Sequence, residues 1–253
     1  MNKNEYNRLV DLLLDFGEAM LLSGGEVSRV EDSIARMGRA FGALETDVFV
    51  ITSSIVLTLC FEDSVRITST RRIVSSVSTD FIKLEKLNDL SRKCADKNPN
   101  IDELGNKLGE IKKLHVRNNK FYIGSLLAAG GFAIFFGGSV PDGVAAGVFA
   151  LAICLLQQRV APKCPNSIIF NFICSAVIGG CICLIAGLLP FLHSDKIIIG
   201  DIMLLIPGIA ITNSVRDMLV GNMLSGGIKF IESLLCTGAL SLGFMLAISA
   251  IGV

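Results

Sequence analysis

The sequence predicts a membrane protein in which a small α+β domain precedes a bundle of about five transmembrane α-helices. The chain of 253 residues is 51% hydrophobic, and its mean hydropathy of +0.62 is too high for an average soluble domain. The apolarity is also uneven, because residues 1–120 hold 36 of the 46 charged side chains. We therefore expect a polar domain over residues 1–118 and a transmembrane domain over residues 119–253.

The polar domain is expected to begin with two helices. Apolar residues recur at helical spacing from Tyr6 to Leu22, and Ser23-Gly24-Gly25 breaks the pattern because glycine adopts left-handed conformations at low cost. A second amphipathic helix follows and ends at Gly42.

Composition then changes to β-branched residues. The stretch VFVITSSIVLTLCFE (48–62) predicts either two strands about a Ser53-Ser54 turn or one long strand. Alternation over VRITST (65–70) predicts a half-buried strand, and a further short strand is expected near Ile73–Val77. Helices follow over 81–94 and 101–114, the second capped by Asn100.

The second half of the chain divides into five apolar spans, at roughly 121–139, 143–158, 167–190, 197–212 and 228–252. The second and fourth spans are short for a hydrocarbon core of about 30 Å. Small residues recur four apart in three spans, which allows close packing of helices in lipid or against another subunit. These residues are Gly143/Gly147, Gly179/Cys183/Gly187 and Ala239/Gly243/Ala247.

Basic residues predict the orientation. One side of the predicted bundle collects Arg117, Lys120, Arg159, Lys163, Arg216 and Lys229, whereas Lys196 lies on the other side. The positive-inside rule then places the N-terminal domain in the cytoplasm and the C-terminus outside, in a multi-pass protein of the plasma (bacterial inner) membrane. The formal net charge of zero argues against nucleic acid as a partner.

A polar stretch, IPGIAITNSVRDMLVGNMLSGG (206–227), interrupts the apolar half. Pro207 removes a backbone hydrogen bond, so the span should kink at Pro207-Gly208. If helix resumes, Asn213, Arg216 and Asp217 share one face with Val220 and Gly221. An amide, a guanidinium and a carboxylate together suit a zwitterion or a small carboxylate, and transporters use broken helices to bind solutes. The alternative is a cytoplasmic loop in which Arg216 and Asp217 are solvated or paired.

Three acidic residues of the second half are candidates for proton coupling: Asp217, Glu232 and Asp201. Asp201 could instead be a charge near the N-terminus of its helix, at the outer boundary. Glu232 could instead form a surface ion pair with Lys229, three residues earlier. No catalytic set, nucleotide loop or zinc spacing is present, and the eight cysteines contain no CxxC pair. We therefore expect no enzyme activity, cofactor or metal.

Two stretches together resemble the threonine/serine exporter (ThrE) family: SGGEVSRVEDSIARMGRAFG (23–42), followed by VFVITSSIVLTL, and LLIPGIAITNSVRDMLVGNMLSGGIKFIESLL (204–235). The order of soluble domain, helical linker and five spans is also similar to that of the family. The resemblance implies secondary export of threonine/serine-type amino acids or of a dicarboxylate such as succinate. Full-length members carry a second set of spans, so a chain that stops at Val253 resembles the YjjP-like N-terminal half of a split, two-component exporter.

With the resemblance, the residues expected to form the solute pathway are Pro207, Gly208, Asn213, Arg216, Asp217, Gly221, Asn222, Ser225 and Gly226. Asn222 stands where many relatives are expected to have an acid. The expected partners are a small multi-span companion subunit, the lipid bilayer, a small polar solute and, as an option, further copies of this chain. Arg29 and Glu31 belong to the family-like stretch, or form an ordinary salt bridge within the domain. The alternative function is a membrane-anchored sensor or scaffold whose cytoplasmic domain binds a ligand or partner.

Overall fold

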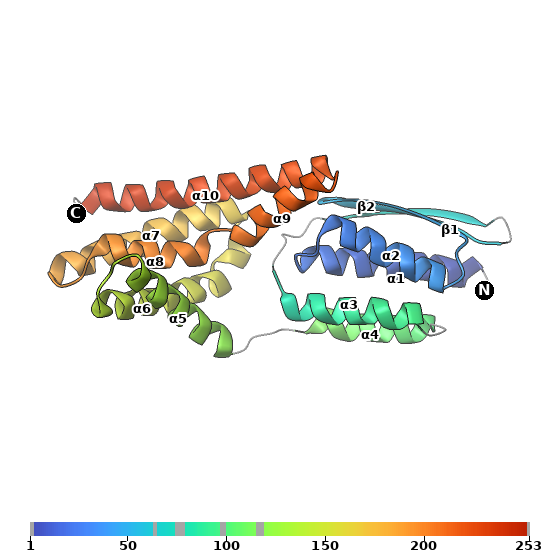
Figure 1. Cartoon of the computed structure of the whole chain (residues 1–253), viewed down its shortest axis with the longest axis horizontal. Coiled ribbons are helices and arrows are strands. Elements are labelled where there is room, and N and C mark those ends of the chain that lie inside the picture. Colours follow the sequence, from blue (N-terminus) through green and yellow to red (C-terminus); the bar gives the residue numbers. More distant parts are fainter. Residues whose placement is uncertain (1–2, 63–64, 74–78, 97–99, 115–118, 252–253) are drawn as a thin grey trace. The chain divides into compact units, whose positions relative to one another are not determined.

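The computed structural model describes residues 3–62, 65–73, 79–96, 100–114 and 119–251 (Figure 1). The chain forms two compact units. The first takes residues 1–116 and 212–230, and the second takes residues 117–211 and 231–253. Each unit has its own cluster of buried hydrophobic side chains. Part of the polar stretch, from residue 212 onward, therefore packs with the N-terminal residues.

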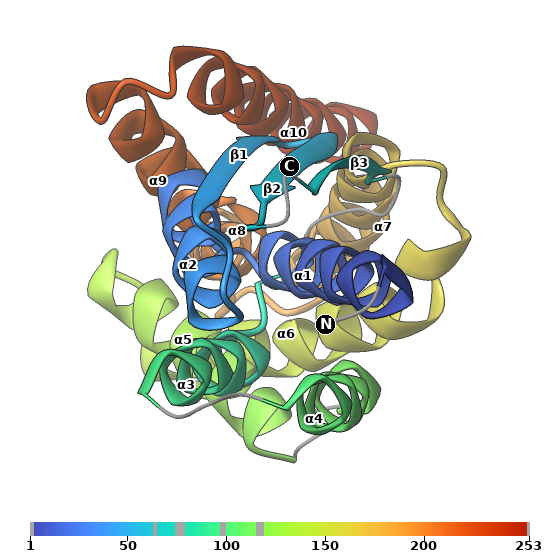
Figure 2. The ribbon, with the colours of Figure 1, turned by 90° about the vertical axis from the view of Figure 1, so that its right-hand side faces the viewer.

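The first unit contains three layers. The helices α1 (Lys3–Leu22) and α2 (Val27–Ala40) lie between a small sheet and the helices α3 (Phe81–Asp96) and α4 (Ile101–Lys113) (Figure 2). All four helices were expected from the apolar periodicity. The predicted cap is confirmed as well, since Asn100 Oδ1 accepts a hydrogen bond from the Asp102 backbone N–H at 2.9 Å.

The sheet is antiparallel, with the order β1-β2-β3: β1 (Glu45–Ile51), β2 (Ser54–Cys60) and β3 (Arg66–Arg72). Ile51 pairs with Ser54, so the stretch 48–62 forms two strands about Thr52-Ser53 rather than one long strand. The strand expected near Ile73–Val77 falls mostly on residues 74–78, which lie outside the described residues.

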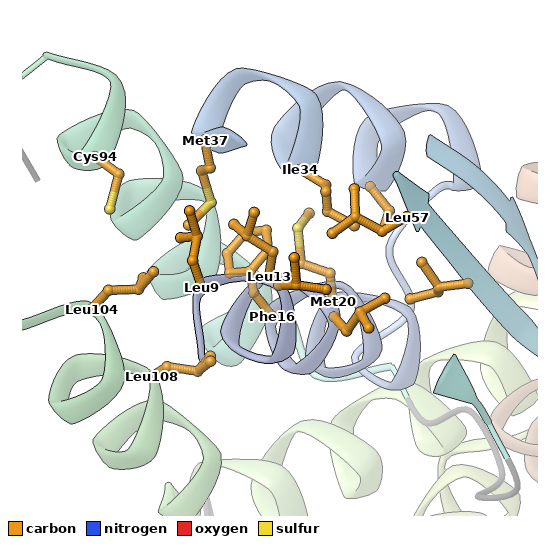
Figure 3. Packing of buried hydrophobic residues seen from close by; sticks show 14 of the residues in the cluster. Leu9, Leu13, Phe16, Met20, Ile34, Met37, Leu57, Cys94, Leu104 and Leu108 are labelled. Carbon is orange, nitrogen blue, oxygen red and sulfur yellow. The ribbon is translucent and has the colours of Figure 1, made fainter. Parts of the chain in front are cut away.

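The core of the first unit forms where α1 meets the other layers. Leu9, Leu13, Phe16 and Met20 of α1 are completely buried and point toward side chains from α2, β2, α3 and α4 (Figure 3). The predicted amphipathic face of α1 is therefore its buried face.

The second unit is helical and apolar. It contains α5 (Asn119–Phe135), α6 (Val140–Arg159), α7 (Ser167–Leu188), α8 (Ser194–Leu205), the start of α9 (Gly208–Leu219) and most of α10 (Met223–Ile251). Within the described residues, three helical segments are long and apolar enough to cross a membrane: Val140–Lys163, Ser167–Leu188 and Met223–Ile251. The bent pair α8–α9 qualifies as a fourth span, and Phe121–Phe135 is a shorter apolar helix. This is the helical composition of a membrane protein.

In the apolar half of the chain, three helix starts differ from the expected boundaries by three residues or more, and one of them is that of α8, at Ser194 rather than 197. α6 begins at Val140 rather than 143, because Ser139 and Asp142 form a capping box that brings the PDG sequence into the first turn. The resulting helix has 20 residues, so it is not short as expected. α10 begins at Met223 rather than 228, so Gly226 and Gly227 lie inside a helix, and the turn is made at Gly221, whose φ is +103°.

Small residues bring the helices of the second unit close together. A Cβ added to Gly143 would lie 3.1 Å from the Gly130 carbonyl oxygen of α5, and one added to Gly243 would lie 2.6 Å from the Phe172 carbonyl oxygen of α7. These contacts confirm the predicted close packing at both positions. Gly187 is different, since nothing lies within 4 Å of its added Cβ.

Candidate functional site

The polar stretch begins at a break between two helices. α8 ends at Leu205 and α9 begins at Gly208, and their axes are bent by 48°. Pro207 has no N–H with which to continue the ladder of α8. The kink predicted at Pro207-Gly208 is therefore confirmed, and helix resumes after it.

The polar residues of α9 differ sharply in burial. Asp217 is 2% exposed and Asn213 is partly buried, whereas the Arg216 side chain is 61% exposed. Val220 and Gly221, expected on the same helical face, lie beyond the end of α9 at Leu219. Arg216 and Asp217 therefore do not point into a shared environment, although they are neighbours in the sequence.

Asp217 is paired with a lysine of the next helix. Lys229 Nζ donates to Asp217 Oδ2 at 2.9 Å, and the Lys229 side chain is only 17% exposed. A buried pair of this kind holds two helices in register, and removing one partner leaves the other charge unpaired. Lys229, which the sequence suggested as a partner of Glu232, thus joins the start of α10 to α9.

Arg216 is paired with the N-terminal segment of the chain. Its Nη1 donates to Glu26 Oε1 at 2.8 Å, and Glu26 is the residue that precedes α2. The carboxylate of Glu26 does not cap its own helix. Both charges that the sequence nominated for a zwitterion therefore already have a partner of opposite charge, as in the paired alternative.

Glu31 lies one helical turn beyond the start of α2 and is half-buried. Its Oε1 accepts the Val50 backbone N–H at 2.9 Å. Burial raises the pKa of Glu31; the Val50 hydrogen bond opposes this effect, and the charges of Asp32 and Asp217 add to it. Within the described part of the chain, Glu31 forms no ion pair with Arg29, so the ordinary salt bridge suggested by the sequence is absent.

The remaining residues of the stretch shape the junction between α9 and α10. The Asn222 backbone N–H donates to the Asp217 carbonyl oxygen at 2.9 Å, which closes the end of α9. Ser225 is buried, and a Cβ added to Gly226 would lie 2.6 Å from the Ser214 carbonyl oxygen. These positions need small side chains because the two helices approach closely.

The two other acidic candidates occupy opposite environments. Glu232 is exposed on α10. Asp201 is 0% exposed, and neither of its carboxyl oxygens has a hydrogen-bond partner. α8 begins at Ser194, so Asp201 lies about two turns inside the helix. The expectation of a charge near the helix N-terminus is therefore wrong.

Sequence reasoning missed one partner of the site, Glu26, and misassigned another, Lys229. The Glu26–Arg216 pair joins residues 190 positions apart, and no local pattern in the sequence indicates such a contact. Among the described residues, no group of three or more His, Cys, Asp or Glu side chains could hold a metal ion.

Comparison with known proteins adds to this geometry. A family model described as "Putative threonine/serine exporter" matches residues 11–251. The "Probable threonine/serine exporter" of Mycobacterium tuberculosis is 22% identical over 250 residues, which cover 96% of this chain and 46% of that protein. The chain thus spans about half the length of this curated relative. No solved structure matches the chain significantly.

Proposed function

The chain belongs to the threonine/serine exporter family, and from that premise we propose that it is a subunit of a secondary exporter of small polar metabolites. Family membership indicates a transport role rather than an enzymatic one, in a multi-pass membrane protein. The proposed solutes are amino acids of the threonine/serine type or a dicarboxylate such as succinate, moved out of the cytoplasm.

The break between α8 and α9 is the observation that supports this proposal most directly. The first turn of a helix leaves backbone N–H groups without partners in that helix, and these groups attract anions. The Gly208 N–H donates to the Ile206 carbonyl oxygen at 2.8 Å, whereas Ile209 and Ala210, the next residues of the first turn of α9, are exposed. We propose that the carboxylate of the solute binds at this end of α9. In other transporters the N-termini of discontinuous helices point at anionic groups of the substrate in the same way.

The ion pairs of α9 could exchange one of their side chains for a charged group of the solute. In our proposal, the solute meets these pairs in separate steps further along α9: its carboxylate competes with Glu26 for Arg216 in one step, and its ammonium competes with Lys229 for Asp217 in another. Each exchange replaces one charge-assisted hydrogen bond by another, so Arg216 and Asp217 keep a partner while Glu26 and Lys229 are released. Asn213, on the same helix, would add an amide to this face.

We propose that transport requires a companion membrane subunit. The aligned region makes up 46% of the mycobacterial relative, so that protein has about as much chain again outside the aligned part. A companion would supply the spans that complete the pathway, whereas the lipid bilayer covers the many exposed apolar side chains of the second unit.

Efflux assays test the proposal. Cells that express the chain with a neighbouring small membrane protein should release labelled threonine, serine or succinate, and Arg216→Ala and Asp217→Asn should each lower that efflux about tenfold or more. Arg159→Ala, at the end of α6, and Asp195→Asn, at the start of α8, are matched controls that should retain efflux. Membrane insertion is measured in parallel. Wild-type efflux in both α9 variants would contradict the proposed site.

A second candidate function is a sensor, and one hollow in the first unit favours it. The hollow has a volume of about 320 Å³ and is lined by Glu18, Asp80, Lys83 and Lys112 among others. Carboxylates and ammonium groups facing one space suit a zwitterion. Calorimetric titration of threonine into the whole purified chain would show binding that Lys83→Ala removes, and absence of heat would exclude this function for threonine.

A further inference from the structure

Asp201 is a carboxyl group buried without any partner. It is 0% exposed, and neither Oδ1 nor Oδ2 accepts a hydrogen bond. Among the described residues, Thr46 Oγ1 is the one other buried side-chain oxygen or nitrogen without a partner. Buried acids are rare and are normally paired, so an unpaired one inside apolar helices calls for a function.

Among the side chains that the structure describes, the helices packed against α8 bring no cation to Asp201. They are α5, α6 and α7. Ser167–Leu188 and Phe121–Phe135 contain no charged residue, and the charged residues of α6, Asp142 and Arg159, lie at its two ends. Besides Lys120, the second residue of α5, the other titratable residues on these helices are Tyr122, Cys154, Cys174, Cys181 and Cys183.

These neighbours have other roles or are uncharged. Cys174 lies within electrostatic range of Asp201, but a thiol carries no positive charge. Tyr122 donates to Gln158 at 2.7 Å. On α8 itself, Asp195 pairs with Lys196 at 3.3 Å. The charge of Asp201 is therefore not compensated within the described structure.

A proton is the ligand that this environment suits. An ionised carboxylate deep in a helix bundle is costly without a counter-ion, whereas a neutral carboxylic acid avoids that cost. A metal cation needs several ligands, and among the described residues no group of three or more His, Cys, Asp or Glu side chains could hold one. We propose that Asp201 is the proton-binding site that couples export to the proton gradient, an inference that rests on the proposed exporter function.

The structure separates Asp201 from the two other acids that the sequence nominated. Asp217 accepts a hydrogen bond from Lys229 at 2.9 Å, so its negative charge already has a counter-ion. Glu232 is exposed and needs none. Of the three, only Asp201 is buried without a counter-ion, so its ionised form is the least stable and protonation stabilises it the most.

The position of Asp201 connects its charge to the break. α8 has 12 residues and ends just before Pro207, so Asp201 and the break belong to one short, rigid helix. Gly200 lies directly against α5, where an added Cβ would be 2.6 Å from the Ala129 carbonyl oxygen. A change of charge at Asp201 therefore acts where α8 contacts its neighbours. In our proposal α8 moves in response, and this movement reaches the break at Pro207. In each cycle one proton joins a carboxylate oxygen and later leaves it, and no other reactant is consumed.

Infrared difference spectroscopy tests proton binding without a transport assay. The whole chain, with ¹³C-labelled aspartate and reconstituted in lipid, is titrated with pH while the carbonyl stretch of protonated aspartic acid is followed. We expect a labelled band that changes with pH in the wild type and in Asp195→Asn but is lost in Asp201→Asn. Asp201→Glu should lose the labelled band while keeping an acid, which serves if the amide variant does not fold. Absence of the band in the wild type, or its persistence in both Asp201 variants, would overturn the proposal.

Transport in vesicles that contain this chain together with the neighbouring small membrane protein gives the second arm. Asp201→Asn should lose solute accumulation driven by a pH gradient while keeping solute exchange without a gradient, and Asp195→Asn should retain both. If wild-type transport follows a sodium gradient instead, Asp201 is not the coupling site for a proton. If the wild type moves no solute, the proposed function fails, and the infrared arm still decides whether Asp201 binds a proton.

Discussion

Three aspartates between residues 121 and 253 are almost completely buried, and their charges are met in three different ways. Asp142 accepts the backbone N–H groups of Ser139 and His193 at 2.7 and 2.8 Å, whereas Asp217 has Lys229 as its partner. Asp201 has none. Burial alone does not distinguish these roles, but the set of hydrogen-bond donors does.

This difference predicts opposite effects on stability. Asp142→Ala leaves two backbone N–H groups without their acceptor, so it should lower the free energy of unfolding by about 1–3 kcal/mol. Asp201→Leu removes an unpaired acid and should leave stability unchanged or increase it. Thermal unfolding in detergent micelles measures both. A lower melting temperature for Asp201→Leu than for Asp142→Ala would show that Asp201 is held by contacts that stabilise its side chain.

Glu31 predicts a dependence of stability on pH. Its pKa is raised in the folded chain, mainly by burial, so the folded state holds a proton more tightly than the unfolded state. The stabilisation is complete below the ordinary pKa of about 4.5 and is lost as pH rises through the higher folded value. Glu31→Gln keeps an oxygen for the Val50 N–H, and its stability should fall less over this pH interval. Unfolding curves between pH 4 and 7 would contradict this if the two chains declined in parallel.

At the scale of helices and strands, most of the fold could be predicted because apolar periodicity and glycine positions act locally. The helices of the first unit follow from these signals, whereas the turn, expected at Ser53-Ser54 in one of two alternatives, lies one residue earlier at Thr52-Ser53. The start of α6 was misplaced because Pro141 and Gly143 resemble a loop, although proline is favoured in a first helical turn. Gly226 and Gly227 fell before the expected start of the fifth span at 228, but they lie inside α10, whose close packing on α9 needs the small residue at 226.

The contact between α7 and α10 gives an element-scale prediction. A Cβ on residue 243 would overlap Ser175 Oγ and lie 2.6 Å from the Phe172 carbonyl oxygen, so Gly243→Ala must push the helices apart. We expect a loss of about 1–3 kcal/mol in unfolding free energy. Gly238→Ala on the same helix has nothing within 4 Å and should be neutral or gain up to about 1 kcal/mol. Equal melting temperatures for the two variants would contradict the close contact.

At the scale of the whole molecule, the sequence could nominate the polar stretch but not its partners. Kinks and charges are local and visible, so Pro207, Arg216 and Asp217 were found. The Glu26–Arg216 pair requires the folded arrangement of segments 190 residues apart. Because Arg216 is 61% exposed, this pair is worth at most about 1 kcal/mol, so it informs on geometry more than on stability.

The number of membrane crossings can be tested by labelling, because two positions lie on the same side of the membrane only if an even number of crossings separates them. We predict that α5 and α6 both cross, which puts the first unit and the loop between α6 and α7 on the same, cytoplasmic side. An impermeant thiol reagent should then miss Cys164 in that loop and also miss Asp47→Cys on the exposed face of β1, in intact cells. Asp195→Cys, in a chain with Cys164→Ser, lies past α7 and should be labelled from outside.

This experiment tests whether the apolar helix Phe121–Phe135 crosses the membrane, since it is shorter than the other candidate spans. If it crosses, Asp47→Cys and Cys164 become reactive together when the membrane is inverted. If it lies along the surface instead, one crossing separates the two positions, and they react from opposite sides. Opposite labelling would reduce the spans to four and place residues 1–116 outside while Arg159 and Lys163 stay inside. That arrangement would put the 18 basic residues of the first 120 positions on the outer side of the membrane, which contradicts the positive-inside rule.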